Sequence, residues 1–360
     1  MADDRSAGPV LLTVLAAAGL LMAAYGRETP VAVARNDSRS TKRGPRSGSD
    51  EGLGRDATSP AQIPAKGWWN VLKRVAKGFS DDRLMTEAAG VTFYVLLALF
   101  PAIATVISLY GLFADPKSVS DQLQNLSGIV PGGGLDIIKD QVASLTSKGA
   151  QALGFSALFG LLTSLWSANQ GIKALFDALN VVYHEHENRS FVRRTLVSLS
   201  FTLGAIVFVL LALAAIVVVP VVLAYIGLDS AVHTLLAVAR WPLMMVVTAA
   251  LLALIYRYGP DRRRARWQWV SWGSAFSAVG WIVGSVAFSY YVANFGSYNK
   301  TYGSLGAAIG FMTWIWISTI IVLLGAELNS ELERQTGRDS TVGAEKPRGE
   351  RGAAPADMVA

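Results

Sequence analysis

Six long apolar segments, separated by charged connections, constrain this chain more than any other feature of its sequence. They span 88–110, 152–172, 196–220, 234–256, 269–292 and 305–326. Each is close to the roughly 20 apolar residues that a helix needs to cross a bilayer. Backbone groups in hydrocarbon must be hydrogen-bonded within the protein, so these segments are expected to be helices. The sequence therefore predicts an all-α fold, a polytopic membrane helix bundle with six core transmembrane helices.

The charges in the connections predict how this bundle is oriented. Only 16% of the residues are charged, and the net charge is +6. Basic residues collect before the first segment and in alternate connections, as at 189–194 and 262–266, whereas 111–151 and 293–304 hold few. Lys and Arg concentrate in cytoplasmic connections. We expect a multi-pass protein of the bacterial inner (cytoplasmic) membrane with both core termini in the cytoplasm, and no specific nucleic-acid partner is needed to explain the basic balance.

Four regions follow from the composition. Residues 1–26 contain a solitary apolar stretch at 9–25, which fits a seventh span, a cleaved signal or a surface helix. Residues 27–65 and 336–360 are poor in large apolar groups, so a disordered basic linker and a disordered cytoplasmic tail are expected there. The six-helix membrane domain between them occupies 66–335.

The second apolar segment carries a stripe of polar residues at helical steps of three and four. The stripe consists of Trp166, Asn169, Gln170, Lys173, Asp177 and Asn180. A charged side chain facing lipid costs several kcal/mol, so the stripe must face other helices or water. It predicts either a polar substrate path or an interhelical hydrogen-bond network. Lys173 and Asp177 are also spaced to pair at i,i+4.

Two smaller groups of polar residues are further candidates. The connection between the fifth and sixth segments is polar and aromatic, and it forms either an external gate or a tight turn. Its candidate residues are Asn294, Tyr298, Asn299 and Tyr302. Three carboxylates stand at segment ends that we expect to be cytoplasmic, namely Glu87, Glu327 and Glu331. The last two share a helical face and could pair with the basic residues at 262–266.

Small residues follow one face of the fifth segment and the start of the sixth. They are Gly273, Ser277, Gly280, Gly284 and Ala287, followed by Gly303, Gly306, Ala307 and Gly310. Small residues at four-residue spacing let helix backbones approach closely. We expect these two faces to be packing surfaces.

The sequence lacks the motifs that most enzyme classes require. There is no Cys, so disulfides and cysteine–metal sites are excluded. No GxxxxGK[ST] loop, HExxH motif or GxSxG elbow occurs. The alternating run His184-Glu185-His186-Glu187 is weak evidence for a metal. We therefore expect no catalytic residues, no metal site, no cofactor and no enzymatic activity.

Several longer motifs resemble one known family. They are Ala88-Ala89-Gly90-Val91-Thr92-Phe93-Tyr94, Leu165-Trp166-Ser167-Ala168-Asn169, Ala174-Leu175-Phe176-Asp177-Ala178-Leu179-Asn180, Asn294-Phe295-Gly296-Ser297-Tyr298-Asn299 and Leu324-Gly325-Ala326-Glu327-Leu328-Asn329. Over about residues 70–335 the chain resembles the YihY / virulence factor BrkB family of inner-membrane proteins. The resemblance implies six spans. The family was once mislabelled as ribonuclease BN and has no securely established activity, so the resemblance implies no catalytic residue for this chain.

Taken with the polar stripe, these observations favour a transporter or exporter of a small solute or lipid in envelope physiology. The alternative is a non-transporting envelope scaffold or assembly partner. The lipid bilayer is the expected partner, and a homo-oligomer is left open.

Overall fold

The computed structural model describes residues 52–113, 150–213, 230–295 and 305–358. Within these ranges the chain is helical, apart from its connections and one isolated bridge between Ala265 and Thr341. The long helices are α3 (Leu84–Phe113), α6 (Ala150–Val182), α7 (Phe191–Leu213), α9 (Ser230–Tyr258), α10 (Trp267–Phe295) and α12 (Leu305–Gln335). The shorter ones are η1 (Pro60–Gln62), α2 (Ala65–Asp81) and α13 (Ala354–Asp357). The predicted all-α class is confirmed for the described ranges.

Each of the six predicted apolar segments falls on one of the six long helices, the third one as far as Leu213, beyond which 214–220 lie outside the described residues. Three stretches of the described residues are long and apolar enough to cross a membrane, namely Phe191–Phe208, Trp267–Val292 and Ala308–Gln335. Leu84–Ala98 and Met245–Tyr258 are shorter apolar helical stretches. The described part of α6 is not among them, because the polar stripe lowers its hydropathy. The helices are thus where the sequence places them, and six complete spans remain a prediction.

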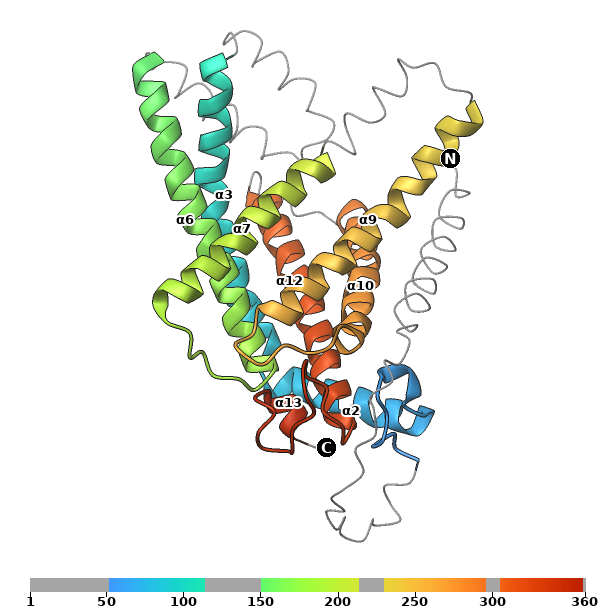
Figure 1. Ribbon diagram of the computed structural model, residues 1–360. Helices are drawn as coiled ribbons and strands as arrows, with labels where there is room; N and C mark the ends of the chain where they lie inside the picture. The colour runs from blue at the N-terminus through green and yellow to red at the C-terminus, as the bar shows by residue number, and fades with distance from the viewer. Residues whose placement is uncertain (1–51, 114–149, 214–229, 296–304, 359–360) are drawn as a thin grey trace.

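Helix α12 joins two wings of the bundle (Figure 1). On one side α3 and α6 lie side by side, and both contact α12. On the other side α10 packs against α12. The main neighbour of α7 is α6, and the main neighbour of α9 is α10, so α7 and α9 are the outer helices of the two wings.

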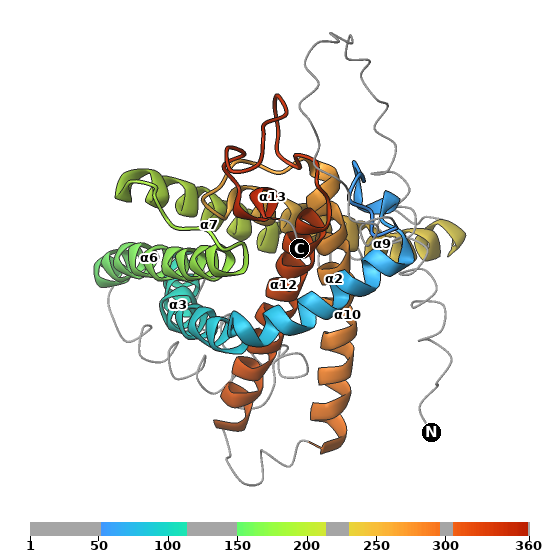
Figure 2. The same ribbon diagram turned by 90° about the horizontal axis from the view of Figure 1, so that it is seen from below.

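Helix α2 crosses the end of the bundle instead of running along it (Figure 2). It packs against α12 and the start of α3, and it buries Gly67 and Val71. Its exposed side presents Trp69 and Leu72 together with lysines. An amphipathic helix of this kind is typical of a membrane–water interface. No apolar segment predicted it, because its apolar residues occupy only one face.

The segments flanking the bundle are more ordered than the composition suggests. We expected disorder at 27–65 and 336–360, but residues 52–65 and 336–358 are folded against the helices. Thr336 Oγ1 donates a hydrogen bond to the Ala57 carbonyl oxygen at 2.6 Å, and Gly337 N donates to the Arg55 carbonyl oxygen at 2.6 Å. We call residues 336–358 the cap. Residues 1–51, with the predicted anchor at 1–26, and the 111–151 connection, apart from its ends, lie outside the described residues.

The cap owes its order to hydrogen bonds instead of an apolar core. The guanidinium of buried Arg351 donates to the carbonyl oxygens of Gly337, Arg338, Lys346 and Ala356. Further backbone bonds connect the cap to the α9–α10 connection, where Arg263 N donates to the Gly352 oxygen at 2.7 Å. The contacts with the α9–α10 connection join residues far apart in the sequence, so composition alone could not reveal them.

Close backbone contact between α10 and α12 confirms the small-residue face predicted for the fifth segment. A Cβ added at Gly273 would collide with the carbonyl oxygen of Gly325, and Gly284 leaves room for Ile321. Ser277 Oγ donates to the Ile321 oxygen at 2.9 Å. The contact on α12 is made at Gly325, whereas Gly310 of the predicted face has open space beside it.

Candidate functional site

The polar stripe of α6 faces α7 and forms three contacts across the boundary between these helices. Thr202 Oγ1 donates to Asn169 Oδ1 at 3.5 Å, and Lys173 Nζ donates to Thr195 Oγ1 at 3.1 Å. At the helix ends Arg194 Nη2 donates to both carboxylate oxygens of Asp177 at 2.7 Å. We call this polar boundary the α6–α7 seam. As the residue numbers rise along α6, those of their partners on α7 fall, so the two helices are antiparallel.

The structure corrects the expected pairing of Lys173 with Asp177. Arg194 occupies the Asp177 carboxylate with one guanidinium nitrogen bonded to both oxygens. The Lys173 ammonium lies instead beside Thr195 and 5.3 Å from the centroid of the Phe191 ring. A Lys–Asp pair at i,i+4 contributes only about 0.2–0.5 kcal/mol, so an arginine on the next helix can displace it. In the described ranges, no carboxylate pairs with Lys173.

The other residues of the stripe have different surroundings. Asn180 is buried, accepts a hydrogen bond from Asp261 N at 2.8 Å and donates to Glu187 Oε2 at 3.3 Å. It therefore connects the end of α6 to the two connections beside it. Gln170 is partly buried, and Trp166 is 60% exposed. Trp166 thus shares the helical face but not the hydrogen-bonded seam.

The predicted external gate or turn is described only at its first residue. Asn294 is exposed near the end of α10, and its Nδ2 donates to the Tyr290 carbonyl oxygen at 2.8 Å. Tyr298, Asn299 and Tyr302 lie outside the described residues. The choice between a gate and a turn stays open.

The carboxylates of α12 are buried but do not pair as expected. Glu331 receives hydrogen bonds from Arg74 of α2 and from Arg334 of its own helix. Glu327 lies against Gly78 of α2, and its Oε2 has no hydrogen-bond partner in the described part of the chain. The expected pairing of these two residues with the 262–266 connection is therefore corrected. Glu87 is partly buried in the first turn of α3.

The pairing with the 262–266 connection is made by Glu333. The side chains of Arg262 and Glu333 are both fully buried and approach to 2.8 Å. The Arg262 guanidinium also lies 4.1 Å from the centroid of the Tyr183 ring, and Ser340 Oγ of the cap donates to Glu333 Oε2 at 2.6 Å. Burial opposes the charge on Arg262, but the electrostatic effects of Glu333, Tyr183 and Glu185 together outweigh burial and raise the pKa of Arg262. Burial likewise raises the pKa of Tyr183.

This buried pair was missed because its partners lie far apart in the sequence. Glu333 stands in the polar run that ends the sixth apolar segment, where several carboxylates were equivalent candidates. The available signal was the 262–266 run itself, since buried arginine requires a counter-charge. The 184–187 run forms no metal cluster with its neighbours, and no group of three or more His, Asp or Glu residues in the described ranges is placed to hold a metal ion.

Apolar helices of membrane-crossing length, with polar groups turned toward other helices, define the class of this molecule: an integral membrane protein with a helical bundle. Comparison with known proteins gives the family. The model of the family described as virulence factor BrkB matches residues 75–350, and the chain belongs to this family.

Relatives from bacteria carry mostly descriptive names. The chain is 28% identical over 273 residues to the putative ribonuclease-like protein YfkH of Bacillus subtilis, covering 73% of this chain and 95% of YfkH. It is 25% identical to a UPF0761 membrane protein of Haemophilus influenzae, covering 71% of this chain and 93% of the relative. A UPF0761 membrane protein of Methylibium petroleiphilum, also 25% identical over 72% of this chain, is matched over only 61% of its length. No solved structure matches the chain.

Proposed function

We propose that this protein transports or exports a small anionic solute, or a lipid with an anionic headgroup, across the bacterial inner membrane along the α6–α7 seam. The observation that carries the proposal is the position of Lys173. Its ammonium lies between two helices, and no carboxylate in the described ranges neutralises it. An uncompensated charge in a membrane helix is costly, and such charges commonly mark substrate paths.

The packing of α7 supports a role for the seam. The main neighbour of this helix is α6, and side chains such as Leu196, Leu203 and Val207 are exposed along it. The seam contacts that hold it are individual hydrogen bonds between side chains. Such contacts can exchange partners with a passing polar group at moderate cost, because a neutral hydrogen bond is worth about 0.5–1.5 kcal/mol and one to a charged group about 1.5–3 kcal/mol.

Flux through the isolated protein tests this proposal. Purified protein is reconstituted into liposomes, small anions are applied in solid-supported-membrane recordings, and transbilayer movement of fluorescent phosphatidylglycerol is followed by dithionite quenching. We expect Lys173→Gln to reduce the rate at least tenfold, and Asn169→Leu to reduce it by a similar amount. Lys77→Gln is the charge-matched control, because that lysine is exposed on α2.

Two outcomes would overturn the proposal. One is the absence of flux for every anion and lipid tried with protein that remains folded. The other is full activity of folded Lys173→Gln and Asn169→Leu variants, which would leave the seam as a packing contact.

A second candidate function, an envelope scaffold or assembly partner, is supported by the same seam interpreted as a hydrogen-bond network. The buried Arg262–Glu333 pair and the close α10–α12 contact fit a rigid body equally well. Photo-crosslinking from the exposed Trp69 and Phe191 positions should then capture one stable partner, while flux by the isolated protein would count against this candidate.

We also propose that the chain is no enzyme, although YfkH is named ribonuclease-like. Hydrolysis of RNA requires a positioned acid–base pair or metal-bound water with aqueous access. Incubation of highly purified protein with structured RNA should give no cleavage above a mock purification. Cleavage that a single substitution in this chain abolishes would contradict this expectation.

A further inference from the structure

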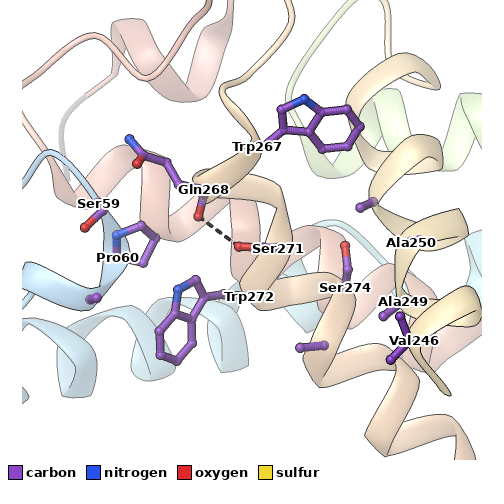
Figure 3. Close-up of a pocket in the computed structure, with 13 residues that line it drawn as sticks. Ser59, Pro60, Val246, Ala249, Ala250, Trp267, Gln268, Ser271, Trp272 and Ser274 are labelled. Atoms are coloured by element: carbon purple, nitrogen blue, oxygen red, sulfur yellow. Dashed lines mark hydrogen bonds between the residues drawn. The ribbon is translucent and has the colours of Figure 1, made fainter. Parts of the chain in front are cut away.

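A groove lies between α9, α10 and the turn at η1 (Figure 3). Small apolar residues of α9 line one side, among them Ala249, Ala250 and Ala253. Gln268, Ser271 and Trp272 of α10 line the second side, and Pro60 closes the third. The empty space is about 700 Å³, counting the part at its open side. The groove is separated from the α6–α7 seam, because the two belong to different wings of the bundle.

The lining changes from apolar to polar along the helices. From Val246 to Ala253 the α9 side is apolar over about 10 Å, at 1.5 Å per residue. The polar lining residue Gln268 stands in the first turn of α10, beside Trp267 and close to where α9 ends. Indole rings and polar groups at the ends of membrane helices mark the lipid headgroup level. The groove therefore has the polarity profile of a phospholipid, with an apolar length and a polar end.

A buried arginine that does not itself line the groove lies against Trp267, one of the residues at the polar end. Arg257 is only 8% exposed, and its guanidinium lies 4.1 Å from the ring centroid of Trp267, which lines the groove. Its Nε and Nη1 have no hydrogen-bond partner in the described part of the chain. Arg264 lies nearby, 4.8 Å from the ring centroid of Tyr258, which Arg257 also approaches.

Arg257, in the last turn of α9, and Arg264, in the α9–α10 connection, differ from Arg262 in their surroundings. Arg262 pairs with Glu333, whereas no carboxylate in the described ranges pairs with Arg257 or Arg264. Arg264 is exposed to solvent, but Arg257 is buried. A buried charge without a partner is strongly unfavourable, so an anion from outside the chain would be stabilised beside Arg257. The positive charge continues on α2, where lysines are exposed beside Trp69, namely Lys66, Lys73 and Lys77. Charge complementarity therefore selects a lipid of net negative charge.

We propose that this groove binds one anionic glycerophospholipid, with an acyl chain along Ala249, Ala250 and Ala253 and its phosphate at the Trp267 end, next to the charge of Arg257. The Trp267 indole lines this end and supports the Arg257 guanidinium by a cation–π contact. The site is independent of the transport proposed for the seam, so each can fail without the other.

Native mass spectrometry of the purified full chain tests the site. The probes are phosphatidylglycerol and phosphatidylcholine with identical acyl chains, added to detergent-solubilised protein after delipidation. We expect phosphatidylglycerol to bind more tightly, and Arg257→Gln to weaken its binding about tenfold, in line with the loss of one charge-assisted contact. Arg193→Gln is the charge-matched control, because this residue is exposed on α7.

A second pair of variants tests the apolar part and does not depend on Arg257. Ala250→Phe should fill the groove and weaken phosphatidylglycerol binding severalfold, while Ala205→Phe, on the exposed surface of α7, should not. Equal binding of the two lipids would overturn the proposal, as would equal losses in Arg257→Gln and Arg193→Gln. The proposal would also be overturned if millimolar inorganic phosphate displaced the lipid and Ala250→Phe left lipid binding unchanged, since that would indicate a site for a free anion.

Discussion

Two antiparallel helix pairs of this bundle, α10–α12 and α6–α7, are held together in opposite ways. In the first pair Gly273 and Gly325 bring the backbones into contact, and short Ser277 bonds directly to the Ile321 carbonyl oxygen. In the second pair the helices meet through longer side chains, such as Lys173 with Thr195. Direct backbone contact fixes the distance between the α10 and α12 axes. Contacts between long side chains can form at several distances between the α6 and α7 axes.

The ion pairs at the ends of the two helix pairs show the same contrast. The side chains of Arg262 and Glu333 are fully buried, and Ser340 of the cap bonds to the carboxylate. Asp177 and Arg194 are, by side chain, 53% and 27% exposed. Removing one member of a buried pair is strongly destabilising, because the remaining charge is left without water or a partner. An exposed pair is screened and contributes little. The α10–α12 pair is therefore the rigid part of the bundle, and the α6–α7 pair is the adjustable part.

The largest expected effect comes from separating the rigid pair. Gly325→Leu would drive a side chain into Gly273, Ser277 and the Tyr256 hydroxyl, and we expect little or no folded protein to be recovered. Gly310→Leu is the matched control, because nothing lies within 4 Å of the added Cβ there. Size-exclusion profiles and thermal unfolding in detergent provide the measurement. Normal folding of Gly325→Leu would remove the basis for calling this pair rigid.

Breaking the buried ion pair should have the next largest effect. Glu333→Gln leaves Arg262 buried without a counter-charge, and we expect a loss of about 3–5 kcal/mol in the free energy of unfolding. Glu345→Gln removes one exposed carboxylate from the cap and should change stability by less than about 0.5 kcal/mol. Denaturant unfolding of the two variants in the same detergent measures the difference. Equal free energies of unfolding for the two variants would show that the Arg262–Glu333 pair does not stabilise the fold.

The smallest effect is expected at the end of the adjustable pair. Asp177→Asn should cost about 0.2–1 kcal/mol, because its pair with Arg194 is half exposed. Asp81→Asn, which weakens an exposed contact with Lys77 on α2, serves as the control. Both variants are measured beside Glu333→Gln. A cost for Asp177→Asn as large as that of Glu333→Gln would abolish the distinction between the two pairs.

The positions of the long helices followed from the sequence, because twenty or so apolar residues in succession have few alternatives in a membrane. The packing face of α10 also followed, since Gly273, Ser277 and Gly280 leave one face without bulk, but the identity of its partner, α12, did not. Contacts between distant charged residues did not follow. Local spacing suggested Lys173 with Asp177, but Arg194 on the neighbouring helix offers a closer and better oriented donor.

The cap and α2 escaped prediction for a related reason. The composition of 336–358 resembles that of disordered chains, but Arg351 bonds carbonyl oxygens within the cap, and the cap also bonds to distant segments such as the α9–α10 connection. Helix α2 has too few apolar residues for a span, and its lysines are also explained by membrane topology. In both segments the decisive contacts are with α12 and the segments near it, which no local pattern can reveal.

The cap has a consequence for how the molecule is made. It touches segments near Arg55, Glu185 and Arg263, which are translated long before it. The long helices are therefore synthesised before the cap can close over their shared end, and Glu333 receives its hydrogen bond from Ser340 only after synthesis has passed the last helix. Until the cap is made, the Glu333 carboxylate of the nascent chain lacks the cover that Ser340 and the cap give it in the finished protein. A membrane protease or chaperone could tell the two apart by this difference alone.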